Sequence, residues 1–550
     1  MTDSRILIFG VDGATFDLIR PWAAAGYLPN LARLMKNGVH GNLESTLPPV
    51  TSPAWPTFMT GCNPGKHGVF DFIRPKGNDF DLVNATNIQQ PTIWQLLSQA
   101  EFKVGVMNVP VTYPARPVNG FIITGLLSPS RGGDVCYPAD LITRYQPKLG
   151  PYRIAPRVQY TPGAEEPFVA DMYNLIETHG RWGLHLMQHE PWDVFMLHFL
   201  SLDVMQHAMW RFMDQTHPRH KPNNPFENAI REGYIKVDAA IGRMLEQVDE
   251  RATVLVMSDH GFGPLHAIVN LNNYLLQKGI IKLKPGLWTQ LKAAAFRRGF
   301  TPAAVFGWMS RLGVQNTVAH VSKGTRNKVM GKFLSYDSVD WSRTLAYSLG
   351  HVGQIYLNIA GREPEGIVQR QERAAALEQV MNALLELKDE HGRQLVSKLI
   401  PRTETYHGRH AEYGPDLHVV LDNYNMISFP LFATDGKIIT QQIRGDSGCH
   451  RSEGIFIAHG PGIRRGETLT GASLLDLAPT ILHLAGLPVR SEMDGQVLAG
   501  IFETPPQVRY TQSAADAQQK DPEPFAGQHT GLSADETAEV EQRLRSLGYL

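Results

Sequence analysis

The 550-residue sequence predicts an α/β fold with a mostly parallel central sheet. Short apolar, β-rich runs recur along the chain, and helical patterns separate several of them. The composition, 43% hydrophobic and 19% charged, is that of a globular protein and excludes a disordered, collagen-like or coiled-coil chain. At this length the chain exceeds one ordinary compact domain and can bury a large core.

The first strand is expected at Arg5–Val11, where an apolar run stops at Asp12-Gly13. Similar runs predict further strands at Val104–Asn108, Phe121–Thr124, Val194–Leu200, Thr253–Met257, His418–Leu421 and Ile455–Ala458. Helical patterns lie at Leu28–Met35, Ile93–Gln99, Tyr234–Val248 and Ala374–Leu387. In such sheets, functional side chains lie just beyond the carboxyl ends of the strands.

The stretch Gly261–Tyr336 interrupts this alternation, contains no Asp or Glu, and carries 11 Lys and Arg residues. Helices are expected in it at Leu287–Phe300 and Pro302–Val314. The formal net charge of the whole chain is −1, so the remainder is near −12, and the chain is not a globally basic nucleic-acid binder. We expect no sequence-specific nucleic-acid binding.

These patterns predict three parts. A main α/β domain is expected from residues 1–264 and 340–510, and a basic, mainly helical insertion or cap from residues 265–339. A polar tail follows at residues 511–550, with a final helix at Ala534–Leu547.

Cysteine usage and apolar patterning predict the compartment. The three cysteines are too few for a disulfide framework. The first apolar run, Ile6–Phe9, is too short for a signal peptide, and no run of about 18 apolar residues occurs. A cytoplasmic protein is expected, with peripheral membrane contact through the basic insertion as a further expectation.

Asp and His residues accompany several predicted strands, and they could converge at one edge of a parallel sheet. Each alone is weak evidence, since an Asp at a strand end is usually a helix cap and an isolated His is usually structural. Three Asp and three His together can supply mixed nitrogen and oxygen ligands for two divalent cations such as zinc. The set is Asp12, Asp203, His207, Asp259, His260 and His450.

A nucleophile candidate, Thr51, lies in the segment Pro48–Trp55. A threonine hydroxyl attacks poorly unless a base or metal activates it, and a nearby dimetal centre would do so. Thr51 or Ser52 could instead be a helix N-cap. Both interpretations can hold, because a helix N-terminus favours a bound anion.

Together these residues resemble the alkaline phosphatase superfamily, and most closely its nucleotide pyrophosphatase/type I phosphodiesterase branch. The resemblance implies a three-layer α/β/α sandwich with a mostly parallel sheet, to which the basic helical insertion is added. The matching segments occur in family order over roughly residues 5–500 and are Val11–Gly13, Thr51 with Thr60–Gly68, Asp203–His207, Ser258–Gly261, His450 and Asp476–Leu482.

The resemblance also implies two divalent metal ions, zinc or alternatively manganese. Asp12, Thr51, Asp259 and His260 would hold one ion, and Asp203, His207 and His450 the other. Thr51 would attack phosphorus and form a covalent phosphothreonine, which water would then hydrolyse. The substrate would be a small anionic phosphate ester, and the metals would neutralise its developing charge.

The sequence departs from the branch at two places. The branch usually carries an Asn after the pair His67-Gly68 that helps to bind a phosphate oxygen, whereas here Val69-Phe70-Asp71-Phe72 follows. The segment around His450 is a variant of Gly-x-His-Gly, with Arg451 in the last position. Arg451 is a candidate phosphate contact or a structural ion-pair partner. We interpret His67 as structural and His198 and His266 as non-ligands.

Several functions compete. Besides a phosphodiesterase or nucleotide pyrophosphatase, the superfamily contains phosphomonoesterases and phosphoryl or phosphoglycerol-type transferases. A sulfatase is disfavoured because Cys62 lies about ten residues after Thr51 and Lys66 replaces an Arg of its motif. A cofactor-independent phosphoglycerate mutase is disfavoured because no large second domain is evident between the segment of Thr51 and Asp203. A non-catalytic binding protein is disfavoured because all seven candidate site residues are present.

The basic insertion starts directly after Asp259-His260, at the rim of the predicted site. We hypothesise that it is a cap that attracts an anionic substrate. Alternatively it contacts an anionic membrane or a lipid-linked phosphate, or is a solvated helix pair packed on the core. Its apolar side chains include Leu287, Trp288, Leu291, Phe296, Phe306 and Trp308.

Overall fold

The computed structural model describes residues 5–76, 79–130, 132–298, 336–429, 432, 437–441, 445–511 and 532–546. The chain divides into two compact units. Unit 1 comprises Met1–Pro264, Tyr406–Gly414 and Arg444–Leu550, and unit 2 comprises Leu265–Thr405 and Pro415–Ile443. Unit 2 therefore contains the predicted insertion and also residues 340–405 and 415–443, which were expected to belong to the main α/β domain.

Unit 1 is built on a ten-stranded mixed sheet with the order β20-β2-β19-β9-β1-β8-β5-β6-β7, where β21 also pairs with β2. Its strands are β1 (Ile6–Val11), β2 (Val39–Glu44), β5 (Val104–Met107), β6 (Gly120–Ile123), β7 (Cys136–Tyr137), β8 (Val194–Phe199), β9 (Thr253–Met257), β19 (Glu453–His459), β20 (Glu467–Thr468) and β21 (Ala472–Ser473).

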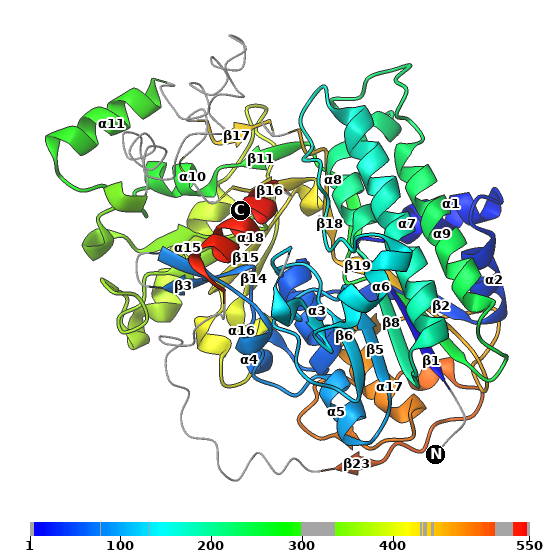
Figure 1. Cartoon of the computed structure of the whole chain (residues 1–550). Coiled ribbons are helices and arrows are strands. Elements are labelled where there is room, and N and C mark those ends of the chain that lie inside the picture. The colour runs from blue at the N-terminus through cyan, green and yellow to red at the C-terminus, as the bar shows by residue number, and fades with distance from the viewer. Residues whose placement is uncertain are drawn as a thin grey trace. The chain divides into compact units, whose positions relative to one another are not determined.

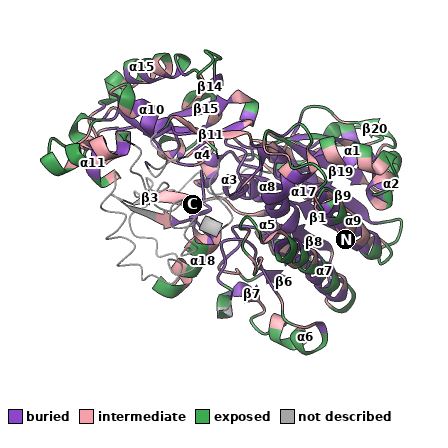
Figure 2. Ribbon diagram, turned by 90° about the horizontal axis from the view of Figure 1, so that it is seen from above, coloured by how far each residue is buried: buried purple, intermediate pink, exposed green. Residues whose placement is uncertain are grey.

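The centre of this sheet is parallel. β1 pairs in parallel with β8 on one side and β9 on the other, and β5 pairs in parallel with β8 and β6. Every residue of β1, β8 and β9 is buried, as Figure 2 shows. Continuous apolar runs are typical of strands that are covered on both faces, and these three strands carry the candidate site at their carboxyl ends.

Helices cover the sheet of unit 1 in two groups (Figures 1 and 2). One group packs α2 (Pro29–Asn37), α7 (Glu165–His189), α8 (Ser201–Met213) and α9 (Ala229–Leu245) together, with α7 against β8. The other packs α3 (Thr51–Thr60), α5 (Ile93–Gln99) and α17 (Leu477–Leu484), with α5 against β5. This is the three-layer α/β/α arrangement that the resemblance implies.

Unit 2 has its own sheet of seven strands, ordered β12-β13-β15-β16-β11-β17 with β14 paired to β15. A separate apolar core, which includes Val269, Leu275, Phe296, Ile355 and Leu417, lies between this sheet and its helices. The elements are β11 (Ala267–Val269), α10 (Leu271–Gln277), α11 (Leu287–Arg297), β12 (Ala346–Ser348), β13 (Gln354–Leu357), α15 (Arg373–Leu385), β14 (Val396–Pro401), α16 (Arg402–Thr405), β15 (Leu417–Leu421), β16 (Met426–Ser428) and β17 (Ile439–Thr440).

Shorter elements complete unit 1. They are α1 (Phe16–Ala24), α4 (Pro64–His67), β3 (Ile73–Lys76), β4 (Asp79–Leu82), α6 (Leu141–Leu149), β10 (Gly261–Pro264), β18 (Gly448–Arg451), β22 (Val489–Arg490), β23 (Tyr510–Thr511) and α18 (Ala534–Ser546). The helix α18 confirms the predicted final helix.

The expected α/β fold class is confirmed. Two of the predicted strands, however, are not parallel strands of one central sheet. The predicted strand His418–Leu421 is β15 and belongs to the sheet of unit 2. The predicted strand Ile455–Ala458 is part of β19, which runs antiparallel to both β9 and β2. The predicted helix Leu287–Phe300 corresponds to α11, whereas Pro302–Val314 lies outside the described residues.

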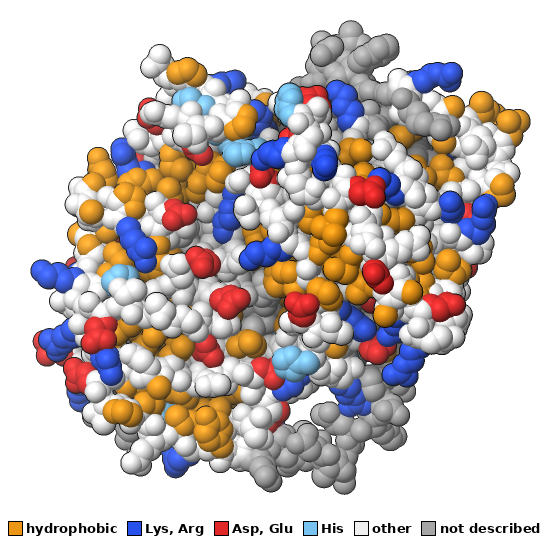
Figure 3. All heavy atoms as spheres, turned by 180° about the vertical axis from the view of Figure 1, so that it is seen from behind, with side chains coloured by type: hydrophobic (Ala, Val, Ile, Leu, Met, Phe, Trp, Pro, Cys, Tyr) orange, Lys and Arg blue, Asp and Glu red, His pale blue; other side chains and the backbone are white. Residues whose placement is uncertain are grey.

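Charges of both signs are interspersed on the face drawn in Figure 3, in keeping with the net charge of −1. Among the residues that the structure describes, none of the helices is long and apolar enough to cross a membrane.

Candidate metal centre

The candidate ligands lie where three neighbouring parallel strands end. Asp12 directly follows β1, and Asp259 and His260 directly follow β9. Asp203 and His207 lie on α8, which begins two residues after β8, so their i, i+4 spacing places them on one helix face. Because β1 lies between β8 and β9, these segments meet at one edge of the sheet.

His450 reaches the same place by a different route. It lies on β18, which pairs antiparallel with β10, and Phe262 is its partner across the ribbon. β10 directly continues the chain after His260, so the ribbon returns His450 to the end of β9. The rings of His260 and His450 are stacked with their centroids 3.7 Å apart.

The side chains form two adjoining groups that share His260. One group is Asp12, Asp259 and His260, the other is Asp203, His260 and His450, and the ligand atoms within each group lie within 4.8 Å of one another. His207 joins the second group, because its Nε2 lies 2.9 Å from Nε2 of His450 and 3.6 Å from Oδ1 of Asp203. The structure thus brings all six Asp and His candidates together within unit 1.

The three histidines are oriented alike. Nδ1 lies 3.1 Å from the Gly448 carbonyl in His207, 3.1 Å from the Gly261 carbonyl in His260, and 2.8 Å from the Pro49 carbonyl in His450. A carbonyl only accepts, so we assign a proton to Nδ1 of each ring. Each Nε2 lone pair then faces the carboxylates, as in metal-binding histidines whose second nitrogen is held by a hydrogen bond.

Burial sets the protonation of the carboxylates when no cation is bound. Burial and the nearby Asp203 raise the pKa of Asp259 to about 7. Burial, followed by the charges of Asp259 and Asp203, also raises the pKa of Asp12 well above its ordinary value. Burial would raise the pKa of Asp203 too, but His207 and His450 outweigh that effect and lower it. Three carboxylates so close together require a balancing positive charge.

The donor set fits divalent cations. Oδ1 of Asp12 and Oδ2 of Asp259 are buried and accept no hydrogen bond from the described residues. Burial lowers the pKa of His207 to about 4 and also lowers the pKa of His260 well below its ordinary value, so both rings are neutral ligands near pH 7. Carboxylate oxygen with imidazole nitrogen is the ligand type of zinc and related transition metals.

Thr51 lies beside these groups as the first residue of α3. Its Oγ1 is buried and lies 3.3 Å from Nε2 of His260. Val50, which precedes the helix, offers no side-chain cap to the first backbone N–H groups of α3. The hydroxyl of Ser52 is buried and has no hydrogen-bond partner among the described residues. These donors at a helix N-terminus could bind an anion beside Thr51.

Comparison with known proteins then identifies the family. The profile of the type I phosphodiesterase/nucleotide pyrophosphatase family matches residues 6–429. The chain belongs to this family. The match confirms the resemblance stated from the sequence, and the chain has two groups of Asp and His residues that could hold metal ions.

This phosphodiesterase-family chain is also similar to solved structures. Phosphonoacetate hydrolase from Sinorhizobium meliloti 1021, solved with phosphonoacetate, aligns with a TM-score of 0.50 at 14% identity over 86% of this chain and 94% of that one. Human ectonucleotide pyrophosphatase/phosphodiesterase 5 aligns with a TM-score of 0.48 at 14% identity over 91% of this chain and 100% of that one.

One curated relative matches a limited segment of this family member. GPI ethanolamine phosphate transferase 2 of Eremothecium gossypii is 33% identical over 106 residues, which are 19% of this chain and 11% of that protein. The match therefore spans about a tenth of the relative's length.

In this phosphodiesterase-family chain, Arg451 does not lie on the same side of β18 as the candidate ligand His450. Neighbouring residues of a strand face opposite sides, so Arg451 lies on the other face of β18 from His450. Its guanidinium donates to the carbonyls of Pro264, His450 and Cys449 at 2.7, 3.0 and 3.3 Å. These bonds hold the β10–β18 ribbon together, and a contact of Arg451 with phosphate stays a prediction.

His67 and His198 support the site from behind. Nε2 of His67 lies 2.9 Å from Oγ1 of Thr57 in α3, which ties α4 to the helix that starts with Thr51. Nε2 of His198 lies 2.9 Å from Oδ2 of Asp12. The sequence predicts His198 only as a non-ligand and gives it no supporting role. The signal for one was present, because His198 is a histidine inside the otherwise apolar strand β8.

A glycine shapes the first turn of the site. Gly13 has a φ of +65° and its N–H donates to Oδ1 of Asp259 at 3.4 Å. A Cβ at this position would lie 2.9 Å from the ring of Phe262 and 3.3 Å from Oδ1 of Asp203. Glycine therefore allows both the left-handed backbone and the close approach of β1 to α8 and β10.

Proposed function

We propose that the chain is a metal-dependent phosphoesterase that cleaves phosphodiester or pyrophosphate bonds through a covalent phosphothreonine at Thr51. One observation carries the proposal. The hydroxyl of Thr51 lies at the N-terminus of α3 and 3.3 Å from Nε2 of His260, the residue shared by both candidate ligand groups.

In this proposal two divalent ions, zinc or alternatively manganese, are the cofactors. Asp12, Thr51, Asp259 and His260 would hold one ion, and Asp203, His207 and His450 the other. When bound, the ions would lower the pKa of the attacking hydroxyl group. They would also place positive charge beside the phosphate oxygens. The mixed carboxylate and imidazole donors, and the Nδ1 atoms held by backbone carbonyls, support this assignment.

The remaining chemistry belongs to residues of the chain. The first N–H groups of α3 and the hydroxyl of Ser52 would hold a phosphate oxygen. Thr51 Oγ1 would form a bond to phosphorus while the bond from phosphorus to the leaving oxygen breaks, and that oxygen would take up a proton. Water would then attack the phosphothreonine, releasing phosphate or its monoester and restoring the Thr51 hydroxyl.

Transfer is a second candidate function, and the segment shared with GPI ethanolamine phosphate transferase 2 favours it. The first half of the reaction would be the same. The second half would differ only in that an alcohol, in place of water, attacks the phosphothreonine.

We also propose a cytoplasmic location. Cys62, Cys136 and Cys449 are all buried and form no disulfide, as expected for a protein of a reducing compartment.

The decisive experiment measures hydrolysis of phosphodiester, phosphomonoester and sulfate ester substrates, with and without a chelator. Thr51→Ala should lower kcat by about 10³-fold or more, and Thr51→Ser should keep part of the activity. Thr60→Ala is the matched control, because it removes a buried hydroxyl from the other end of α3. Activity that survives both the chelator and Thr51→Ala would overturn the mechanism.

Mass spectrometry separates hydrolysis from transfer. Rapid acid quenching during turnover should leave phosphate, or its ester, on the peptide that contains Thr51. Adding an alcohol such as glycerol should then yield a new phosphodiester if the chain is a transferase, and only the hydrolysis product if it is a hydrolase.

A further inference from the structure

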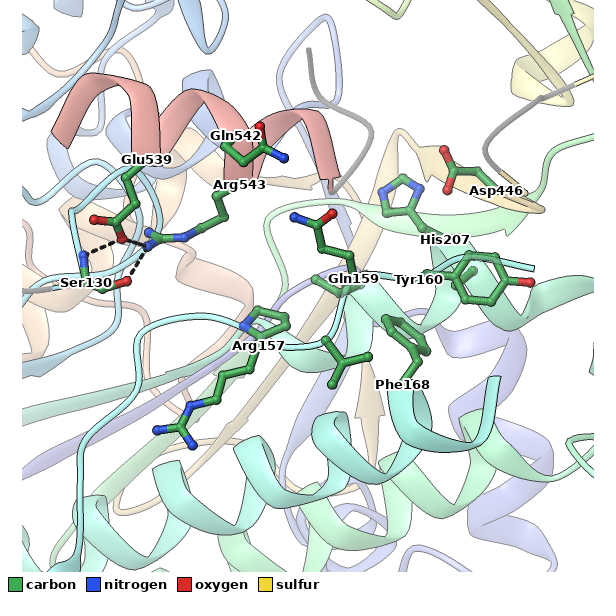
Figure 4. A pocket seen from close by; sticks show the side chains of 14 residues that line it. Ser130, Arg157, Gln159, Tyr160, Phe168, His207, Asp446, Glu539, Gln542 and Arg543 are labelled. Carbon is green, nitrogen blue, oxygen red and sulfur yellow. Dashed lines mark hydrogen bonds and ion pairs between the residues drawn. The ribbon is translucent and has the colours of Figure 1, made fainter. Parts of the chain in front are cut away.

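A cavity of about 210 Å³ opens beside the second ligand group, and His207 forms part of its wall. Val204 and Ala208 of the same helix, α8, also line it. Nε2 of His207 therefore faces His450 and Asp203, while the same residue lies at the border of the cavity. A group attached to a phosphate at the metal centre would find this space next to it. Figure 4 shows the lining side chains.

The inner wall of the cavity is apolar and aromatic. Phe168 of α7 is almost fully buried, and the ring of Tyr160 meets it edge-on with the centroids 5.3 Å apart. The Tyr160 hydroxyl is held in place, since it accepts a hydrogen bond from Arg211 at 2.9 Å. Such a rigid wall suits the C–H surface of a small organic group.

The outer wall is supplied by α18, from the far end of the sequence. Val540 and Leu544 of this helix are fully buried. Glu539 accepts a hydrogen bond from the Ser130 N–H at 2.9 Å, and Arg543 donates to the Ser130 hydroxyl at 2.8 Å, as the dashed lines in Figure 4 show. These contacts anchor α18 in unit 1 and place Gln542 at the cavity.

The polar groups of the wall are balanced in charge. The guanidinium of Arg543 is paired with Glu539 at 2.8 Å, and the formal charges of Arg157 and Asp446 cancel. The side-chain amides of Gln159 and Gln542 are exposed and have no hydrogen-bond partner among the described residues. Each amide can both donate and accept, which is the requirement for binding a hydroxyl group. A second phosphate would meet two carboxylates without a net positive charge.

We propose that this cavity binds the organic group esterified to the phosphate, that this group is neutral and hydroxyl-bearing, and that α18 completes the binding site. The inference rests on the proposed function, because it takes the phosphate to lie at the metal centre. It goes further by naming the class of substrate, a phosphodiester of a polyol or sugar-type alcohol, and by giving the C-terminal helix a role.

The test compares three p-nitrophenyl phosphodiesters whose second group is methyl, glycerol or glycolate. They present a group too small to fill the cavity, a neutral hydroxyl-bearing group and an anionic group. Binding to Thr51→Ala protein is measured by calorimetry, and kcat/KM is measured with the wild type. We expect the glycerol ester to be favoured over both others by about 25-fold, since two added hydrogen bonds each contribute a factor of about five.

Variants of the lining residues test whether the preference for the glycerol ester arises in the cavity. Gln542→Ala and Gln159→Ala should each reduce the preference for the glycerol ester about fivefold, chiefly through KM. Leu544→Asp should also reduce it, because it detaches α18. Gln188→Ala is the matched control, since Gln188 lies on the exposed surface of α7 and donates to Gln247. It should leave the preference unchanged.

Each outcome decides one of the two proposals. Equal binding of the three esters, or a preference for the glycolate ester, overturns the assignment of the cavity. A preference for glycerol that Gln542→Ala, Gln159→Ala and Leu544→Asp all leave intact overturns it as well. Hydrolysis of the methyl ester tests the proposed function separately: if the methyl ester is cleaved and no glycerol preference exists, only the cavity assignment fails.

Discussion

Nε2 of His198 lies 2.9 Å from Oδ2 of Asp12, and both side chains are completely buried. Nδ1 of the same ring lies 2.9 Å from the carbonyl of Asn108, to which it donates. Burial and the nearby His179 lower the pKa of His198 to about 3, so its ring is neutral. A hydrogen bond between the two residues in the metal-free protein therefore uses a proton carried by Asp12, whose pKa burial raises. His198 fixes the position of this carboxylate.

The first prediction concerns this pair. When a cation displaces the Asp12 proton, Nε2 of His198 would take up that proton and donate to the ionised carboxylate. His198→Phe keeps an aromatic ring but removes this donor, so we expect metal affinity to fall about 10- to 100-fold. Equilibrium dialysis with zinc measures it, and saturating metal should restore most of the activity. His179→Phe is the matched control, because His179 is a buried histidine that bonds to the Arg153 carbonyl. Equal affinities of both variants would show that His198 has only a packing role.

The second prediction concerns the packing behind the site. A Cβ on Gly10 would lie 2.8 Å from the ring of Trp55, 2.9 Å from Cε of Met196 and 3.2 Å from the ring of His198. Gly10→Ala should therefore destabilise the fold by about 1–3 kcal/mol and disturb the Asp12 position. Denaturant unfolding measures the loss. Gly286→Ala, where the nearest atom would be 3.7 Å away, should change stability little. A stable Gly10→Ala protein would mean that Trp55 has room to move.

The third prediction concerns metal removal. Asp12, Asp203 and Asp259 are all buried, so their repulsion is relieved when cations bind. A chelator should lower Tm and abolish activity, since metal at about a thousandfold excess over its Kd stabilises the native state by about 4 kcal/mol. The chelator preloaded with zinc is the control and should have no effect.

Metal content and activity of a variant test which residues are the metal ligands. Asp203→Asn should bind less metal by elemental analysis and lose most activity, since Asp203 lies within 3.2 Å of Nε2 of His450. Unchanged metal content and activity in this variant would show that the ligand assignment is wrong.

The fourth prediction concerns pH. Burial raises the pKa of Asp71 from 3.8 to about 7, and its Oδ1 accepts the Phe72 N–H at 2.7 Å. Because the folded-state pKa is raised, the stability linked to this group is fully present below pH 3.8 and is lost as pH rises through 7. Asp71→Asn keeps the acceptor and removes the charge. Its stability advantage over the wild type should grow from pH 5 to pH 8, to about 3–4 kcal/mol at most. Denaturant unfolding at each pH measures it, and parallel pH profiles would refute the assignment.

The fifth prediction concerns α11 in the basic insertion. Leu287, Trp288 and Leu291 are 75%, 77% and 51% exposed, and Lys284 and Arg298 lie close to them in sequence. Exposed Leu and Trp beside Lys and Arg favour an anionic lipid surface. The protein should sediment with vesicles of phosphatidylserine and phosphatidylcholine, and less with phosphatidylcholine alone.

Variants test whether α11 is responsible. Trp288→Ala should reduce vesicle binding about tenfold, and neutralising Lys284 and Arg298 should reduce it about fivefold each at low salt. Leu385→Ala, which removes a leucine that is 51% exposed on α15, is the matched control. If vesicle binding is absent, or if Leu385→Ala lowers it as much as Trp288→Ala, α11 is not a membrane contact. Neutralising Lys292, Arg297 and Arg298 tests the alternative, in which the insertion attracts substrate and KM rises.

Much of the fold follows from local patterns. The bounds of β9 and α5 agree with those predicted, because each element is a short apolar run or a helical period between clear breaks. The direction of β19 does not follow from its sequence. A buried strand is apolar whether it runs parallel or antiparallel, and the chain reversal before it decides the direction.

The boundaries of unit 2 could not be predicted from the sequence either. Leu417–Leu421 has the same apolar character as β8 or β9, yet it pairs with β13, β14 and β16 in a different sheet. Which sheet a strand joins depends on partners that are distant in sequence. The acid-free segment marked the start of unit 2, but composition could not show that the unit continues to Ile443.

The chemistry available to this protein can be read from its residues alone: Asp and His at strand ends, a threonine before a helix, and a segregated set of basic residues. These depend on residue type and local period, which the chain displays directly. The tertiary structure decided which of them meet. The pairing of β10 with β18 brought His450 onto His260, the pairing of Gly10 with His198 across β1 and β8 placed that histidine beside Asp12, and the docking of α18 enclosed a cavity beside His207. Such contacts join residues hundreds of positions apart, so only the packed fold defines them.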